Sequence, residues 1–357
     1  MKKILFVVEA MGGGVFTYIV DLANELANTY DMYIAYAVRP QTPENYKEYF
    51  DKRIHLICVK SFGRSINAIK DLKAFGEVKK IANQVQPDIV HLHSSKAGVI
   101  GRLVLDGKKT PMFYTPHGYS FLMENYKPVK RKIFHLIEAI CAKRPCTTIS
   151  CSLGEHQETL KLARRATYVN NGINLAEFND LLDETGEPET HPFTVFTLGR
   201  ICYQKGPDIF NSIAKALPDV SFIWIGDGEL RDWLTAPNIK VTGWTERKDA
   251  LRKSMNADVF LLTSLWEGLP LSLIESMYMR KPCIVSDVIG NRDVIRNGEN
   301  GFLCKTLEEY VSAIQAIRDN GAEDVVEQAR QEVITTYNTQ VMGSKYVEIY
   351  SRALQKK

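Results

Sequence analysis

Several signals that would assign this chain to another class of protein are missing from its sequence. No apolar run reaches the roughly 20 residues that a membrane-spanning helix needs. The seven cysteines form no CxxC pair and have no spacing typical of a zinc site. The apolar segment after the N-terminal lysines runs only from Ile4 to Val8 and is interrupted by Glu9, so it indicates a first strand rather than a signal peptide. We therefore expect a reduced, cytoplasmic protein.

Two phosphate-binding fingerprints are also absent. The glycine-rich turn at 12–14 does not continue as GxGxxG, and the chain contains no GxxxxGK[ST]. Gly226 and Gly228 supply the first two glycines of GxGxxG, but Arg231 occupies the third position, which argues against dinucleotide binding. The turn at 12–14 still allows an anion to approach the start of a following helix closely.

Length and charge limit the number of domains, the class of protein and the partners that we expect. A chain of 357 residues suffices for two domains, and 45% hydrophobic and 24% charged residues are typical of a globular protein. Residues 1–171 hold 25 of the 45 lysines and arginines and 15 of the 42 acidic residues, a net charge of +10, and the remainder carries −7. The basic half indicates contact with an anionic partner, and a membrane surface or a charge split without function both stay open. No recognition motif accompanies the charge, so we expect no nucleic-acid partner.

Strand-like runs alternate with helical stretches through both halves of the chain. This alternation predicts an α/β protein with parallel, doubly wound sheets, in which ligands bind beyond the carboxyl ends of strands. A polar stretch at 180–192 predicts a surface loop near a domain boundary, and a second series of alternating strands and helices starts at Phe193. The expected strands are 3–8, 32–38, 54–59, 89–93, 112–115, 147–150, 167–169, 195–198, 220–225, 257–262 and 283–287, and the expected helices are 15–28, 66–84, 95–105, 129–142, 152–162, 271–279 and 341–355.

The stretch 264–282 combines two carboxylates with a helix start. A buried strand leads into a loop with Glu267, Pro270 suits the first turn of a helix, and Glu275 lies within that helix. Eight residues along a helix span about 12 Å, too far for the carboxylate pair of a retaining glycosidase at about 5–5.5 Å. We therefore expect the two carboxylates to bind two ends of one elongated ligand, with an anion over the helix N-terminus.

Other strand ends in the second half carry residues that suit the same ligand. Arginine offers a fork for phosphate oxygens and lysine a point charge, and Arg200 and Lys205 both follow a strand. Two basic groups and a helix N-terminus suit a diphosphate, while Glu275 could accept hydrogen bonds from a ribose and Glu267 could hold a hexose together with the loop at 290–291. These features describe a nucleotide-diphosphate sugar. The expected lining residues are Arg200, Lys205, Gly226, Gly228, Glu267, Glu275, Gly290 and Asn291.

The histidines of the first half allow more than one interpretation. His91 and His93 have the spacing of metal ligands, but no third ligand accompanies them, so we expect packing for His91 and no metal. His117 lies on a tight loop between Pro116 and Gly118, directly after a strand. A histidine there could donate to a substrate oxygen or could be a loop histidine satisfied by the protein itself.

A basic cluster at the start of the helix 129–142 also leaves two interpretations open. Lys127, Lys130, Arg131 and Lys132 oppose the helix dipole, so the cluster needs another reason. The helix could lie on an anionic membrane surface, which would make the protein peripheral on the inner face of the cell membrane. Alternatively, its apolar face packs on the sheet and its basic end is solvated.

Taken in order, these motifs resemble those of retaining glycosyltransferases of family 4, which have the two-domain GT-B architecture. The segments HLHSSKAGVIGRL and YTPHGYSF are most similar to members that build bacterial cell-surface polysaccharides. The match spans nearly the whole chain. Its motifs are the glycines at 12–14, DIVHLH at 88–93, TPHG at 115–118, NNGI at 170–173, Gly199-Arg200, Lys205-Gly206, GDGE at 226–229, and Glu267 with Glu275 as E-x7-E.

The resemblance implies a fold and a reaction. The fold is two Rossmann-like domains facing across a cleft: an acceptor-binding domain at 1–171, onto which a C-terminal helix at about 341–357 packs, and a donor domain at 172–340. The reaction is retaining transfer of a hexose or N-acetylhexosamine from a nucleotide sugar, with UDP-sugar preferred, to a glycan or polyprenyl-diphosphate-linked acceptor. Family members need no metal or other cofactor, and this chain has no DxD triplet.

The resemblance also implies residue roles. Arg200 and Lys205 would hold the diphosphate and neutralise the leaving group, His117 and Glu267 would contact the donor sugar, and retention would use the leaving phosphate as base. Asp293 stands where many relatives have Glu, and the loop at 290–291 reads Gly-Asn rather than Gly-Gly, which weakens the expected hexose contacts. The residues implied to bind the donor are Gly13, Gly14, Arg200, Lys205, Gly226, Gly228, Glu267, Leu271, Ser272, Glu275, Gly290 and Asn291.

Two alternatives stay open beside this function. A nucleotide-sugar epimerase of the GT-B type would share the diphosphate site but needs an acid/base pair in the first domain, where no paired carboxylates are evident. An inactive sugar-nucleotide-binding subunit would not need Arg200, Lys205, Glu267 and Glu275, all of which are present.

Overall fold

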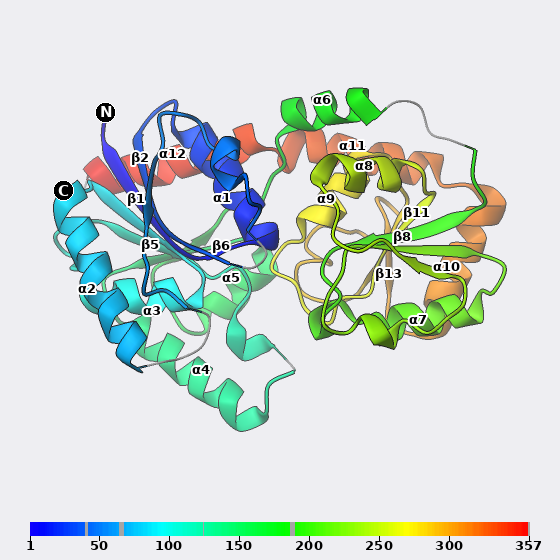
Figure 1. The fold of residues 1–357 in the computed structure, drawn as a ribbon, viewed down its shortest axis with the longest axis horizontal. Helices are drawn as coiled ribbons and strands as arrows, with labels where there is room; N and C mark the ends of the chain where they lie inside the picture. Colours follow the sequence, from blue (N-terminus) through cyan, green and yellow to red (C-terminus); the bar gives the residue numbers. More distant parts are fainter. Residues whose placement is uncertain (40–41, 64–67, 124, 186–189, 356–357) are drawn as a thin grey trace. The chain divides into compact units, whose positions relative to one another are not determined.

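The computed structural model describes residues 1–39, 42–63, 68–123, 125–185 and 190–355. Backbone contacts divide the chain into two compact units, coloured blue to cyan with a red helix and green to orange in Figure 1. Unit 1 comprises Met1–Asn171 and Thr339–Lys357, and unit 2 comprises Gly172–Asn338. Within the described residues, no helix combines the length and the hydropathy of a membrane span.

Unit 1 is built on a seven-stranded parallel sheet in the order β3-β2-β1-β4-β5-β6-β7. The strands are β1 (Lys3–Met11), β2 (Asp31–Val38), β3 (His55–Cys58), β4 (Ile89–His93), β5 (Met112–Thr115), β6 (Thr147–Ser150) and β7 (Ala166–Tyr168). The helices are α1 (Gly13–Leu26), α2 (Ala68–Val85), α3 (Ser95–Val104), α4 (Pro128–Cys141), α5 (Leu153–Leu160) and α12 (Thr339–Gln355), with 3-10 turns η1 (Tyr46–Tyr49) and η2 (Ser120–Leu122).

The central strand β1 is buried on both faces from Ile4 to Val8, which explains the continuous apolar run over these residues. Ile4, Phe6 and Val8 face the core that includes residues of α1 and α12, and Leu5 and Val7 face the core that includes residues of α2 and α3. Alternate side chains of a strand point to opposite faces, so one apolar run serves two layers of helices. The last helix α12 thus belongs to the core of unit 1, beside α1 (Figure 1).

Unit 2 has a six-stranded parallel sheet in the order β10-β9-β8-β11-β12-β13, with α7 and α10 on one face and α8 and α9 on the other (Figure 1). The strands are β8 (Thr194–Leu198), β9 (Ser221–Ile225), β10 (Ile239–Val241), β11 (Val259–Leu262), β12 (Cys283–Ser286) and β13 (Phe302–Cys304). The helices are α6 (Leu175–Thr185), α7 (Pro207–Ala216), α8 (Arg247–Met255), α9 (Leu271–Tyr278), α10 (Leu307–Asn320) and α11 (Glu323–Thr336), with 3-10 turns η3 (Tyr203–Lys205) and η4 (Arg231–Trp233).

Both predicted doubly wound sheets are confirmed, and two local predictions are wrong. The loop predicted at 180–192 is helical as far as Thr185, because buried Phe178 of α6 packs edge-on against the ring of Tyr278. The strand predicted to end at Val8 continues through Glu9, whose buried carboxylate pairs with Arg39 of the neighbouring segment. Residues 186–189 of that loop and 66–67 of the helix predicted at 66–84 lie outside the described part of the chain.

A buried ion pair contributes to the attachment of α4 to unit 1, beside the packing of Phe134 against the core. Arg102 of α3 donates to one oxygen of Glu138 at 2.7 Å, and the Tyr114 hydroxyl donates to the other at 3.0 Å. The guanidinium also lies 4.1 Å from the centre of the Tyr114 ring. The interpretation in which the apolar face of this helix packs on the sheet is wrong for Ile133 and Leu136, both of which are exposed, whereas Phe134 of the same face packs against the core.

We predict that Glu138→Ala destabilises the protein by about 3–5 kcal/mol, because it leaves the Arg102 guanidinium buried without its partner. Urea unfolding followed by circular dichroism measures the loss. Glu158→Ala is the matched control, since it removes an exposed pair with Lys161 and costs about 1 kcal/mol or less. Equal losses in the two variants would contradict the role of the buried pair.

Candidate active site

The strand order of unit 2 reverses between β8 and β11, which lie side by side at the centre of the sheet. The chain proceeds from β8 to β9 and β10 on one side, then returns to β11, β12 and β13 on the other. The loops that leave the carboxyl ends of two such strands diverge, and ligands of open α/β sheets bind in the space that this creates. Here the two loops carry Lys205 and Glu267.

Lys205 and Glu267 form a largely buried ion pair at this point. The Lys205 ammonium lies 2.8 Å from Glu267 Oε1, and the side chains are 17% and 8% exposed. Gln204 donates from Nε2 to the second oxygen of Glu267 at 3.3 Å and to the carbonyl of Trp266 at 3.0 Å. Both carboxylate oxygens thus have a partner from the loop after β8.

The backbone of the two loops is also joined. The Thr263 hydroxyl donates to the carbonyls of Lys205 and Gly206, at 2.8 and 3.0 Å. Gly206 has a φ of +58°, and a Cβ at this position would lie 2.3 Å from the carbonyl oxygen of Thr263. Only glycine tolerates both conditions, so the Lys205-Gly206 pair of the motif is a requirement of loop packing as well as of charge.

Glu275 lies in the second turn of α9 and is 3% exposed. Its Oε1 accepts a hydrogen bond from Arg247 Nη1 of α8 at 2.8 Å. Leu271 and Ser272 occupy the first turn, where backbone N–H groups have no acceptor within the helix and the positive end of the dipole lies. The helix therefore presents an anion site at its start and an oriented carboxylate one turn further on.

Arg200 and the glycines at 226 and 228 lie on the adjoining loops. Arg200 Nε is 2.9 Å from Glu229 Oε2 in a pair that is one-third to one-half exposed, so it can exchange this partner at little cost. A Cβ on Gly226 would lie 2.2 Å from the carbonyl oxygen of Gly199, and one on Gly228 would lie 2.1 Å from that of Ile201. These two glycines bring the loop after β9 against the loop after β8.

The two residues of the loop at 290–291 have different structural roles. Gly290, with a φ of +88°, lies against Glu267, and a Cβ there would be 2.8 Å from the Glu267 Cβ. Its N–H donates to Asp293 at 3.2 Å, so the residue that departs from the family pattern caps this turn. The Asn291 side chain is fully buried and donates to the carbonyl and hydroxyl oxygens of Ser286. The Asn291 side chain therefore points into the protein, which leaves its backbone for contact with a ligand.

The predicted residues of unit 1 lie at neighbouring strand ends of their own sheet. Gly13 and Gly14 begin α1 directly after β1, and a Cβ on either would meet nothing within 4 Å. His117 follows β5 with a φ of +57°. Its Nε2 lies 3.1 Å from His93 Nδ1, at the end of β4, and its Nδ1 lies 3.5 Å from Cys151 Sγ, after β6. Both ring nitrogens of His117 thus have partners within the protein.

Burial keeps this histidine group neutral. It lowers the pKa of His117 to about 3, and it lowers the pKa of His91 and His93 well below the usual value, helped by the neighbouring imidazoles. Burial also raises the pKa of the Cys151 thiol, so that a thiol hydrogen can donate to His117 Nδ1. His91 is held as expected of a packed residue, by the Tyr350 hydroxyl at 2.6 Å.

Sequence reasoning missed three residues of these sites. Gln204 immediately precedes Lys205 and could have been found from the motif. Arg247 and Cys151 contact Glu275 and His117 from distant segments, and no sequence signal indicates these contacts. Among the described residues, no group of three or more His, Cys, Asp or Glu side chains could hold a metal ion.

Comparison with known proteins identifies the fold and the family of the chain. A family described as Glycosyltransferase Family 4 matches residues 12–177, and one described as Glycosyl transferases group 1 matches residues 192–320. Sucrose-phosphate synthase from Thermosynechococcus elongatus superimposes with a TM-score of 0.82 at 15% identity, covering 100% of each chain. The fold is therefore the GT-B fold of glycosyltransferases.

Two curated relatives narrow the class. The chain is 30% identical to the Escherichia coli UDP-Gal:alpha-D-GlcNAc-diphosphoundecaprenol alpha-1,3-galactosyltransferase, with 85% of each chain covered. It is 24% identical to the Campylobacter jejuni N,N'-diacetylbacillosaminyl-diphospho-undecaprenol alpha-1,3-N-acetylgalactosaminyltransferase, with 84% of this chain and 86% of the relative covered. The chain belongs to glycosyltransferase family 4 and is an enzyme of that class.

We predict that Arg247→Met raises the KM for the donor about tenfold with a smaller effect on kcat, because Glu275 loses its orienting hydrogen bond. Steady-state kinetics with varied donor tests this. Lys248→Met is the matched control, since this neighbouring residue forms an exposed ion pair with Glu184. A donor KM unchanged in Arg247→Met would contradict a positioning role.

We also predict that His117 makes stability depend on pH. Its pKa is about 3 in the folded protein, and an exposed histidine titrates near 6.5, so below pH 6.5 the unfolded state binds a proton that the folded state does not. Stability is therefore lost as pH falls, by up to about 1.4 kcal/mol per pH unit. His117→Asn should make this slope shallower between about pH 6 and pH 5, with the contribution of buried His91 and His93 remaining, whereas the exposed control His55→Asn should keep the full slope. Urea unfolding measures the slopes, and identical slopes for His117→Asn and the wild type would refute the assignment.

Proposed function

We propose that the protein transfers a hexose or N-acetylhexosamine, with retention of configuration, from a UDP-sugar to a sugar linked to a polyprenyl diphosphate. The product would be an intermediate of a bacterial cell-surface polysaccharide. One observation carries the donor site: the Lys205–Glu267 pair at the switch point of the sheet, beside the start of α9. The names of the Escherichia coli and Campylobacter jejuni relatives support the choice of acceptor, and the former supports UDP.

The diphosphate lies at Lys205 and the first turn of α9 in this proposal. An ammonium group has three N–H donors, of which Glu267 takes one, so two are left for phosphate oxygens. The N–H groups of Leu271 and Ser272 add backbone donors at the positive end of the helix dipole. Arg200 joins them when its guanidinium leaves the exposed Glu229 for phosphate, a stronger bidentate partner.

The two carboxylates fix the ends of the donor. Arg247 holds one oxygen of Glu275, and the second, for which the described residues offer no hydrogen-bond partner, accepts from the ribose hydroxyls. Glu267, fixed by Lys205 and Gln204, uses its remaining lone pairs for hydroxyls of the sugar, assisted by the backbone of the loop at 290–291.

The transfer step needs no protein nucleophile in this proposal. The bond between the anomeric carbon and the leaving phosphate oxygen breaks, and the acceptor oxygen bonds to the same face of that carbon. The acceptor proton passes to the leaving phosphate. Lys205 and Arg200 stabilise the negative charge that grows on the diphosphate, and this difference between the ground and transition states accelerates the reaction.

We predict that Lys205→Gln lowers kcat/KM by about 100-fold or more, the usual effect of removing one charge-stabilising donor. Initial-rate transfer assays with a UDP-sugar test this. Lys215→Gln, an exposed lysine of the helix that follows, is the matched control and should retain wild-type activity. Wild-type kcat/KM in Lys205→Gln would remove the site from the mechanism.

The same preparation separates transfer from epimerisation. Incubation with UDP-N-acetylglucosamine alone, followed by chromatography of the nucleotide sugars, should return the donor with unchanged configuration. Appearance of its epimer in the absence of an acceptor would instead identify an epimerase.

A further inference from the structure

A carboxylate that the proposed mechanism does not use is buried beside His117. Glu155 occupies the first turn of α5 and is 1% exposed. Its Oε1 accepts a hydrogen bond from the Gly118 N–H at 2.7 Å, and its Oε2 accepts one from the Cys151 N–H at 2.8 Å. The negative charge of the acceptor strengthens both bonds. One side chain therefore joins the loop after β5 to the loop after β6.

Capping of α5 explains only part of this arrangement. Ser152 is the N-cap of the helix and accepts from the Glu155 N–H at 3.2 Å, and the two residues have the S-x-x-E spacing of a capping box. In the capping box of α10, the carboxylate of Glu309 accepts from backbone N–H groups at the start of its own helix. The bond from Glu155 to Gly118, 37 positions away, is not needed for capping and indicates a second role.

The backbone at His117 is strained, and the Glu155 bond lies next to it. His117 has a φ of +57° and Gly118 a φ of +90°, a region that is unfavourable for a residue with a Cβ. The bond to the Gly118 N–H fixes the peptide group between these two residues, and with it the direction in which the His117 side chain leaves the backbone. The second bond of Glu155 fixes Cys151, whose Sγ lies 3.5 Å from His117 Nδ1. Glu155 thus holds the imidazole through its backbone and through its thiol partner.

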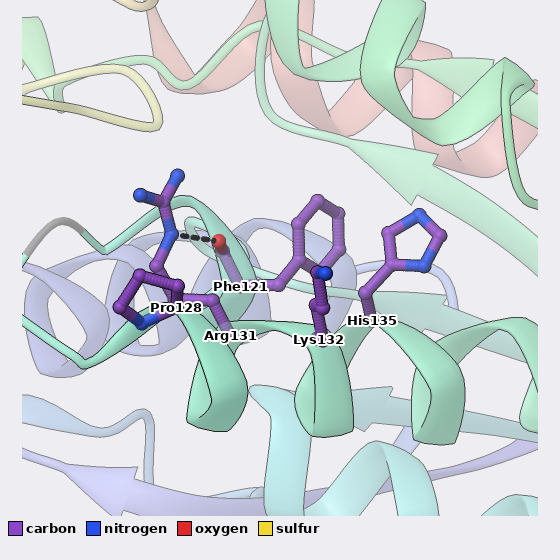
Figure 2. Close-up of a pocket in the computed structure, with 5 residues that line it drawn as sticks. All are labelled: Phe121, Pro128, Arg131, Lys132 and His135. Atoms are coloured by element: carbon purple, nitrogen blue, oxygen red, sulfur yellow. Dashed lines mark hydrogen bonds between the residues drawn. The ribbon is translucent and has the colours of Figure 1, made fainter.

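The far end of the same loop is anchored independently of Glu155. Figure 2 shows Arg131 of α4 donating from Nε to the carbonyl of Phe121, at 2.9 Å. The Tyr119 hydroxyl lies 2.9 Å from the hydroxyl of Thr159 in α5. Loss of the Glu155 carboxylate should therefore release the first residues of the loop and leave the rest of it in place.

We infer that Glu155 is a positioning residue of the transfer reaction and acts through His117. His117 lies beyond the carboxyl end of β5, at the edge where ligands of open α/β sheets bind, and it keeps partial solvent exposure, whereas its partners His93 and Cys151 are buried. Strain at a non-glycine residue is a feature that clusters at functional sites. The inference rests on the proposed function, since it requires the imidazole to contribute to transfer.

A double-mutant cycle with His117 tests the inference. Glu155→Gln keeps the size of the side chain but replaces one of two acceptor oxygens by an NH2 group, so that either Gly118 or Cys151 loses its acceptor. Initial-rate assays with a UDP-sugar should show a kcat about tenfold lower than that of the wild type and a donor KM within about twofold. In the His117→Asn background, where asparagine tolerates the left-handed φ, the same substitution should change kcat by less than about twofold.

Matched controls separate positioning from folding. Glu309→Gln changes the capping carboxylate of α10, and Tyr119→Phe removes a hydrogen bond from the loop that carries His117. Both variants should keep the wild-type kcat. Glu155→Asp, whose shorter side chain cannot reach both N–H groups, is a second variant with the same expected loss, and circular dichroism should show that the variants are folded.

A readout without transfer distinguishes failure of this inference from failure of the proposed function. Long-range 1H–15N correlation spectra of 15N-histidine-labelled protein report the His117 imidazole, which is assigned by its loss in His117→Asn. Its signals should shift in Glu155→Gln and keep their wild-type positions in Glu309→Gln.

Three results would overturn the inference: unshifted His117 signals in Glu155→Gln, an equal loss of kcat in the wild-type and His117→Asn backgrounds, or wild-type kcat in His117→Asn itself. If the His117 signals shift but the wild type transfers no sugar from UDP-sugars, the proposed function fails and the control of His117 by Glu155 stands.

Discussion

The ion pair between Lys205 and Glu267 joins the two loops that diverge from the centre of the second sheet. The strand order of the sheet reverses here, so the two loops diverge. An unpaired lysine or carboxylate buried this deeply would cost folding free energy. Pairing removes that cost and fixes both side chains, while hydrogen bonds from Gln204 and Thr263 hold the backbone around them. The proposed donor site therefore rests on a rigid framework in which few groups need to move.

Unit 1 uses buried polar contacts for a different purpose. The hydroxyl of Tyr350 meets His91, and the hydroxyl of Tyr18 meets that of Tyr346 at 2.5 Å, so that α12 is joined to β4 and α1 by hydrogen bonds as well as by packing. The neighbouring His93, His117 and Cys151 link the ends of three adjacent strands. A neutral, largely buried network of this kind favours one arrangement of the core, because loss of a partner would be destabilising.

Patterns local in sequence predicted the fold well. Alternating apolar runs and helical spacing were sufficient for both sheets, since every strand of a parallel sheet is buried and reads as an apolar run. Charged residues inside elements misled the reasoning: Glu9 interrupted β1 in the sequence, and the acidic residues near Asp180 concealed the end of α6. Glu9 is paired with Arg39, which follows β2, and α6 is held by the contact of Phe178 with Tyr278 of α9.

The candidate site shows the same difference between local sequence signals and contacts from distant elements. Lys205 and Glu267 stood out because each lies on a loop that follows a strand, but Arg247 is recognised only once its contact with Glu275 of α9 is seen. Burial of Asn291 and exposure of Ile133 and Leu136 on α4 likewise depend on tertiary contacts, those of Asn291 with Ser286 and of Glu138 with Arg102. Sequence spacing therefore indicated which side chains come together in the candidate site, and the structure showed which hydrogen bonds and ion pairs orient them.

The most direct test of the account is the affinity of Lys205→Met for uridine, UMP and UDP, measured by isothermal titration calorimetry. If Lys205 binds the diphosphate and Glu275 the ribose, the substitution should leave uridine binding unchanged and weaken UDP binding about tenfold or more. Equal affinities of the variant and the wild type for UDP, or an equal loss for uridine and UDP, would contradict the proposed placement of the donor.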